Sequence, residues 1–118
     1  MILILHPKNW GLDEVTVNKL AKKALKHFGY VENKVELSIN FVGRKKAKEL
    51  NIKYRSKSYI PQVLGFPMSK FADVDGKVWL GDIVICTQKL KYESKFLKKN
   101  IDIVLADWLV HGVENLHK

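Results

Sequence analysis

The segment Val35-Glu36-Leu37-Ser38-Ile39-Asn40-Phe41 decides how the chain folds. Its odd-numbered residues are apolar and its even-numbered residues are polar. This two-residue period is typical of a β-strand with one buried face and one face in water. A second apolar run, Ile83-Val84-Ile85-Cys86, follows the interrupting pair Gly81-Asp82 and predicts another buried strand. These two strands predict a sheet at the centre of the fold.

Segments with the periodicity of helices lie before, between and after these strands in the sequence. Asp13 is the expected N-cap of a helix that runs to about Phe28, with Gly29 just past its end. A short basic helix is expected at about 44–54, and Thr87 can cap another that runs to about Leu97. The last expected helix covers about 101–116, with apolar residues recurring at helical spacing.

Three shorter segments complete the expected order. Met1-Ile2-Leu3-Ile4-Leu5 reads as a buried first strand, and Val63-Leu64-Gly65-Phe66 as a short strand closed by Pro67. The turn signal Asp75-Gly76 predicts a hairpin between Phe71–Val74 and Lys77–Leu80. With no linker or repeat in the chain, we expect one domain over residues 1–118. Its fold class is α+β, with helices packed on a mixed β-sheet.

Composition narrows the class of partner. The 118 residues are 47% hydrophobic and 28% charged, which excludes a disordered tail. Lys and Arg number 21 against 12 Asp and Glu, so the formal net charge is +9. This excess favours a polyanion, nucleic acid first and an anionic membrane surface second.

Cysteine use and apolar run lengths indicate the compartment. Cys86 is the one cysteine, so no disulfide forms within the chain and no CxxC metal site exists, which fits a reducing, cytoplasmic setting. The apolar start at Met1–Leu5 is too short for a signal peptide or a membrane span. We therefore expect no membrane partner.

Metal-binding residue types gather at the end of the chain. His111 and Asn115 are one helical turn apart and face the same way, as two metal ligands on a helix do, although zinc prefers imidazole, thiolate or carboxylate to an amide. His117 lies about 240° around the helix from His111. A packed or hydrogen-bonded histidine is the alternative interpretation.

Two other segments carry candidate binding residues. Lys53, Arg55 and Lys57 form a basic segment just before a loop, where the planar guanidinium suits phosphate oxygens. A solvated, basic helix end is the alternative. Asp82 precedes an apolar strand and either orients a ligand or caps a backbone turn.

Four segments, in order, resemble motifs of the YbeY family of bacterial metal-dependent endoribonucleases, which act in ribosomal RNA maturation. Glu49-Leu50-Asn51-Ile52-Lys53-Tyr54-Arg55 resembles the family's ELNxxYR, and Val63-Leu64-Gly65-Phe66-Pro67 its VLSFP. Leu80-Gly81-Asp82-Ile83-Val84-Ile85 resembles LGDIvI, and Val110-His111-Gly112 the start of the zinc motif HGxxHxxGxDH. The resemblance covers about residues 35–116 and implies the family's mixed sheet with packed helices.

The resemblance also implies a site. In the family three histidines hold zinc, which activates water or polarises a phosphate, and the Arg of YR contacts the RNA backbone. Carried over, His111 is the first ligand and Arg55 the catalytic phosphate contact. The second ligand position falls on Asn115, and the third would fall beyond Lys118. Either the chain is a degenerate or truncated relative, or His117 substitutes through a local rearrangement.

Three functions follow as expectations. The first is an endoribonuclease-type rRNA maturation factor with zinc as cofactor, acting on ribosomal RNA or the small ribosomal subunit. The second is a non-catalytic RNA- or ribosome-binding relative of the same fold. The third is a basic domain that binds an acidic protein. The first two share every feature except the set of metal ligands.

Overall fold

The computed structural model describes residues 1–68 and 76–117, and the expected hairpin strand Phe71–Val74 and Asp75 lie outside them. The element order agrees with the sequence-based expectation. The elements are β1 (Ile2–Leu5), α1 (Glu14–His27), the 3₁₀ helix η1 (Glu32–Lys34), β2 (Val35–Val42), α2 (Arg44–Arg55), β3 (Val63–Pro67), β4 (Val78–Cys86), α3 (Thr87–Leu97) and α4 (Ile101–His117).

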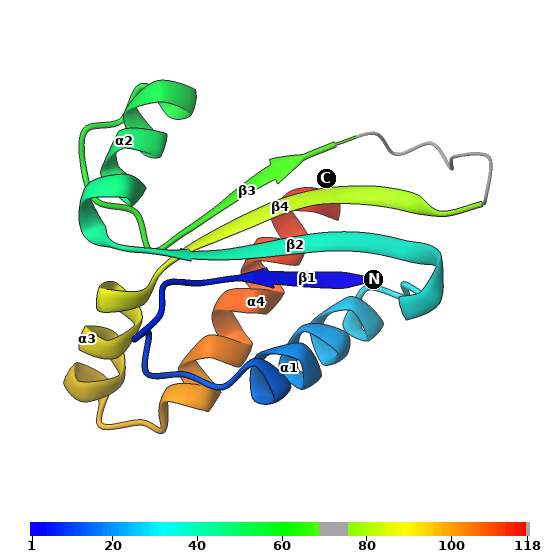
Figure 1. The fold of residues 1–118 in the computed structure, drawn as a ribbon, viewed down its shortest axis with the longest axis horizontal. Helices are drawn as coiled ribbons and strands as arrows, with labels where there is room; N and C mark the ends of the chain where they lie inside the picture. The colour runs from blue at the N-terminus through cyan, green and yellow to red at the C-terminus, as the bar shows by residue number, and fades with distance from the viewer. Residues whose placement is uncertain (69–75, 118) are drawn as a thin grey trace.

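One mixed sheet organises these elements, in the order β1-β2-β4-β3. The strands β1, β2 and β4 run parallel, and β3 pairs antiparallel with β4 (Figure 1). The two strands that the sequence singles out, β2 and β4, are therefore the central pair. This arrangement confirms the α+β fold class with a mixed sheet.

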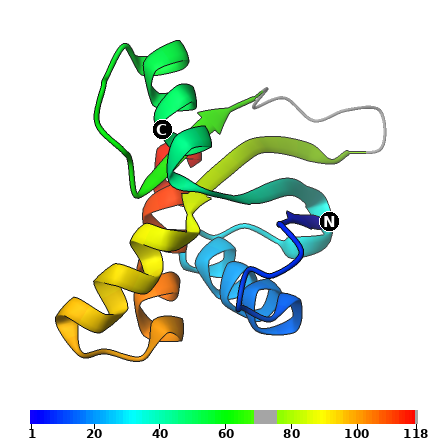
Figure 2. The same ribbon diagram turned by 60° about the vertical axis from the view of Figure 1, so that its left-hand side comes forward.

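The two faces of the sheet are covered unequally. Helices α1 and α4 lie on one face, and α2 stands at one end of the opposite face (Figures 1 and 2). The alternating apolar residues of β2 point to α1 and α4 and are almost completely buried. Burial of this face is the main source of stability. The core includes Val17, Ala21, Leu25, Leu37, Ile39, Ile83, Ile85, Leu105, Leu109 and Val113.

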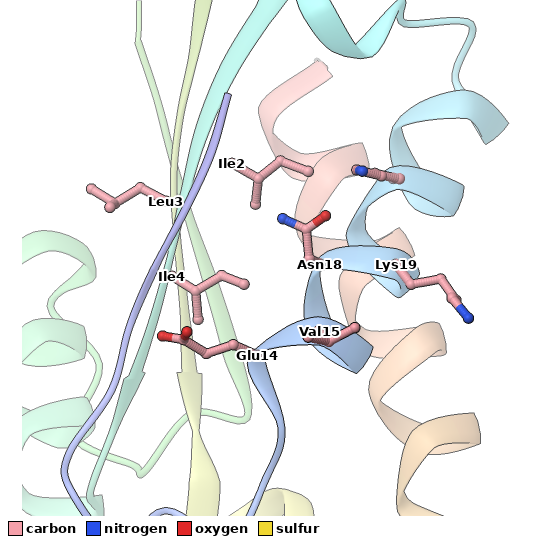
Figure 3. A pocket seen from close by; sticks show the side chains of 8 residues that line it. Ile2, Leu3, Ile4, Glu14, Val15, Asn18 and Lys19 are labelled. Carbon is pink, nitrogen blue, oxygen red and sulfur yellow. The ribbon is translucent and has the colours of Figure 1, made fainter.

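The first strand is only half buried, so the expectation of a buried strand was wrong. Ile2 and Ile4 point toward α1, whereas Leu3 points to the opposite side of the sheet (Figure 3). Leu3 and Leu5 are 44% and 49% exposed. The strand alternates because α1 covers one face of β1 and no described element covers the other.

Gly81 and Asp82 do not interrupt β4, which runs from Val78 to Cys86. Instead the pairing with β2 shifts by one residue between Glu36 and Leu37, which makes a β-bulge. Gly81 has a φ of +136° in this bulge. The extra residue returns Ile83 to the core face and leaves Asp82 on the opposite face.

Helix ends follow the expected capping at α1 but not at α3. Asp13 accepts a hydrogen bond from the Thr16 backbone N–H at 3.2 Å, as expected of an N-cap. Thr87 is not the cap of α3, because Cys86 takes that position and Thr87 is the first helical residue. The buried hydroxyl of Thr87 makes no hydrogen bond among the described residues. None of the described helices is both long enough and apolar enough to cross a bilayer.

Replacing Gly81 with alanine should destabilise the fold by about 3 kcal/mol. An added Cβ would overlap the Phe66 carbonyl oxygen on β3 and would force a backbone conformation that L-residues rarely adopt. Urea unfolding measures the change. Gly43→Ala is the matched control, because Gly43 has open space around it and an ordinary φ of −80°. Equal losses in the two variants would contradict the bulge explanation.

Candidate functional site

The basic end of α2 is held by a buried asparagine. Asn51 is completely buried, and its amide nitrogen donates to the Tyr59 carbonyl oxygen at 3.0 Å. The Arg55 guanidinium donates to the side-chain Oδ1 of Asn51 at 3.4 Å and to the Tyr59 hydroxyl at 3.3 Å. These contacts tie the loop after α2 back to the helix. They also hold one nitrogen of the Arg55 guanidinium, while the side chain as a whole stays exposed.

The three cations that the sequence predicts do not share one face. Lys53 lies over the Tyr54 ring, with 5.2 Å from its Nζ to the ring centroid. Ser56 ends α2 in the left-handed conformation, so Lys57 follows a turned backbone. The structure instead places Arg55 with Lys89 of α3. Both line a depression of about 350 Å³ with Tyr59, Ile60, Pro61, Gln62 and Val63.

His111 and Asn115 are exposed on one side of α4, as their spacing predicts. The His111 Nε2 lies 3.5 Å from a carboxylate oxygen of Asp107, one turn earlier in the helix. Gly112 explains how close α4 comes to the sheet, since a Cβ there would lie 2.9 Å from two side-chain carbons of Ile83. On β3, a Cβ at Gly65 would lie 3.0 Å from the Asn115 Cβ. The pair therefore stands beside β3.

His117 lies on a different side of α4. Its Nδ1 is 2.6 Å from the Tyr30 hydroxyl, and its ring contacts Phe28 at 5.5 Å between centroids. Burial raises the pKa of the Tyr30 hydroxyl above its ordinary value. These contacts pack His117 against the end of α1, in line with the angular separation from His111 that helical geometry gives.

The described residues do not assemble the expected zinc site. In residues 1–68 and 76–117, no group of three His, Cys, Asp or Glu side chains converges closely enough to hold a metal ion. His111 has Asp107 and Asn115 near it on α4, whereas His117 is engaged with α1. A zinc ion needs three or four protein ligands, so this donor set does not fit one.

Gln62 connects the α2 end with α4. It lines the depression that holds Arg55, and it also lines a second depression together with Asp107. The Gln62 amide donates to a Glu93 carboxylate oxygen at 2.9 Å. The second depression is lined by two carboxylates, Glu93 and Asp107, together with Lys99, so it is less cationic than the depression that holds Arg55 and Lys89.

Asp82 does not cap a turn. It lies within β4 on the sheet face that α1 and α4 leave uncovered, opposite Ser38 on β2 and Phe66 on β3. Its carboxylate accepts a hydrogen bond from the Ser38 hydroxyl. The ligand-orienting interpretation of Asp82 stays a prediction.

Comparison with known proteins identifies the fold and the family. The family model described as "Endoribonuclease YbeY" matches residues 6–117. The chain belongs to the YbeY family. The solution structure of TM1509 from Thermotoga maritima has a TM-score of 0.61 at 20% identity, covering 100% of this chain and 73% of that one. That likeness supports the YbeY-like fold.

Curated relatives bear the same family name. The chain is 33% identical over 105 residues to endoribonuclease YbeY of Thermodesulfovibrio yellowstonii, covering 89% of this chain and 63% of the relative. It is 36% identical over 97 residues to endoribonuclease YbeY of Blochmanniella floridana, covering 80% and 61%. The chain thus spans less than two thirds of the length of these YbeY relatives.

Sequence reasoning missed Tyr59 and Lys89 as parts of this region, and it gave Asn51 no role of its own. Asn51 belongs to the segment that resembles the family's motif. The sequence signals its burial only through its position on the inner side of the basic helix. Lys89 is separated from Arg55 by more than thirty residues and becomes its neighbour only through the fold. The roles of Arg55, His111, Asn115 and His117 stay predictions.

Replacing Asn51 with alanine should cost about 2 kcal/mol of stability, because the Tyr59 carbonyl and Arg55 lose a buried partner. The loop over residues 56–62 should also exchange its amide hydrogens faster. Hydrogen exchange with urea unfolding measures both effects. Asn18→Ala on α1 is the control, since Asn18 lines an open depression and its side chain makes no hydrogen bond to the residues that the structure describes. Unchanged exchange over 56–62 would refute the tethering role.

Proposed function

We propose that this chain binds RNA during ribosomal RNA processing in the cytoplasm, with Arg55 as the central phosphate contact. The single observation that carries the proposal is the depression in which Arg55 and Lys89 lie together at the tethered end of α2. Two cations on one concave surface suit a phosphate group. Lys53 and Lys57 lie two residues before and two residues after Arg55 in the sequence and add to the positive charge of this end of α2.

Three further features support RNA over an acidic protein as the partner. The net charge of +9 favours a polyanion, and Arg55 occupies the arginine position of the family's YR motif. Curated relatives are named endoribonucleases. The relatives are endoribonucleases by name, which supports RNA, and the motifs that resemble the rRNA-maturation family lead us to propose ribosomal RNA or the small ribosomal subunit as the partner.

Metal-assisted cleavage is the second candidate function. The family name and His111 favour it, since His111 occupies the first position of the zinc motif. The donor set among the described residues does not fit zinc, so we derive no hydrolytic step from it. Non-catalytic binding needs only the cationic surface, and the present geometry supports binding better than cleavage.

Arg55→Ala should weaken binding of a short single-stranded RNA about tenfold at moderate salt. The plot of log affinity against log salt should lose about 0.7 from its slope, since one phosphate contact is removed. Fluorescence anisotropy across a salt series measures both quantities. Arg44→Ala is the matched control, because Arg44 lies at the opposite end of α2 and its removal changes the net charge equally. Identical losses in both variants would contradict a specific role of Arg55.

Elemental analysis separates binding from cleavage. For a non-catalytic binder we expect purified protein to contain much less than about one zinc per chain and to leave RNA uncut in added zinc. About one zinc per chain that is lost in His111→Ala but kept in His27→Ala would restore the endoribonuclease assignment. His27 is a suitable control because it lies in the last turn of α1.

A further inference from the structure

The uncovered face of the sheet carries a groove with a polar centre. The groove has a volume of about 580 Å³ and extends from β1 across β2 and β4 to β3, with α2 at one end. Apolar and aromatic side chains form most of its lining. The polar ones are Ser38, Asn40 and Asp82, with Lys46 of α2 also in the lining.

Strand register explains how the polar centre is built. Leu3, Ser38, Asp82 and Phe66 are consecutive register partners across all four strands and form one row on this face. The bulge at Gly81 places Asp82 in that row. A carboxylate therefore stands in the middle of the row, with a phenyl ring beside it on the edge strand.

Hydrogen bonds fix the orientation of the polar centre. The Ser38 hydroxyl, which is 4% exposed, donates to one carboxylate oxygen of Asp82. The Asn40 amide nitrogen donates to the Ser38 oxygen at 3.0 Å. The second carboxylate oxygen of Asp82 and the side-chain Oδ1 of Asn40 have no hydrogen bond to the described residues. The centre therefore presents hydrogen-bond acceptors to an occupant.

Aromatic rings flank these acceptors. Phe66 packs against Tyr54 of α2 with 5.2 Å between ring centroids, and Tyr54 is 57% exposed. Trp79 of β4 lines the same groove. Phe66 and Trp79 are half-buried. Accessible aromatic rings are the surfaces on which unstacked RNA bases stack, at about 1–3 kcal/mol per base.

We propose that this groove binds one unpaired RNA base, with guanine preferred, and that Asp82 reads its Watson–Crick edge. The proposal rests on the proposed function, because it names the part of the RNA that this chain reads. Guanine presents two adjacent N–H donors that match a carboxylate, whereas the uracil edge presents one donor between two carbonyl oxygens. The carboxylate repels a phosphate, so the backbone lies toward the exposed Lys46.

Two hexanucleotides test the preference: all-uridine RNA, and the same RNA with one guanosine. The wild-type protein should bind the guanosine RNA about tenfold more tightly in fluorescence anisotropy. Asp82→Asn keeps the shape but replaces an acceptor with a donor, and it should abolish the preference. Asp102→Asn makes the same charge change in the first turn of α4 and should keep it. Equal wild-type affinities, or a preference that survives Asp82→Asn, would overturn the proposal.

Two phenylalanine substitutions, one inside and one outside the groove, test the stacking of bases on Phe66. Phe66→Leu should weaken binding of both RNAs about tenfold, whereas Phe96→Leu should leave it unchanged. Phe96 is 69% exposed on α3 and stacks on Tyr92, outside the groove. Thermal unfolding of each variant verifies that the fold is kept. Equal binding by Phe66→Leu and the wild type would remove the ring from the site.

A mononucleotide titration separates this inference from the proposed function. Trp10 and Trp108 are 6% and 5% exposed, so fluorescence quenching by guanosine monophosphate should report on Trp79 and disappear in Trp79→Phe. RNA binding through Arg55 without quenching or base preference would leave the proposed function intact and overturn the base site. Sedimentation that shows a dimer abolished by Phe66→Leu, with no base preference, would assign the groove to a second copy of the chain instead.

Discussion

The close approach of α4 to the central strands is the constraint on which the rest of the structure depends. Gly112 brings the helix backbone against Ile83 of β4, and no larger residue fits there without displacing that side chain. With α1 beside it, α4 covers one face of the sheet and buries the alternating apolar residues of β2. The same contact sets the rotation of α4, which leaves His111 exposed and turns His117 toward Tyr30.

Covering only one face of the sheet has a consequence for function. The opposite face carries a groove lined by aromatic rings and by the polar side chains of Ser38, Asn40 and Asp82, and α2 stands at one end of this face (Figure 2). Arg55 and Lys89 lie near the C-terminal end of α2, while Ser38 and Asp82 lie in the middle of the sheet. In the two proposals, the phosphate contacts that give affinity and the base contacts that give selectivity are therefore supplied by different parts of the same chain. Neither requires a metal ion.

Much of the fold was predictable because local patterns decide it. Alternation in β2 and the Asp13 cap of α1 each act over a few residues, so the sequence shows them directly. The bulge at Gly81 was not predictable, because it depends on the register with β2. The half-exposure of Leu3 depends on which face the helices cover, and no local pattern of β1 contains that information.

The candidate site was likewise predictable only in part. Helical geometry alone separated His111 from His117, and the structure agrees. Other neighbours come from segments that are distant in sequence. Arg55 and Lys89 line one depression, and Ser38, Asp82 and Phe66 form one row across three strands. Such contacts arise from tertiary packing, so single-segment reasoning finds the residues but not their neighbours.

Mapping the RNA-binding surface by NMR tests the central claim most directly. A single-stranded RNA hexanucleotide carrying one guanosine is titrated into the protein, and backbone amide shifts are followed. We expect the largest changes at the end of α2, in residues 56–62, near Lys89, and along β2, β4 and β3. Changes concentrated on α1 and the Tyr30 end of α4, or no changes at moderate salt, would contradict it.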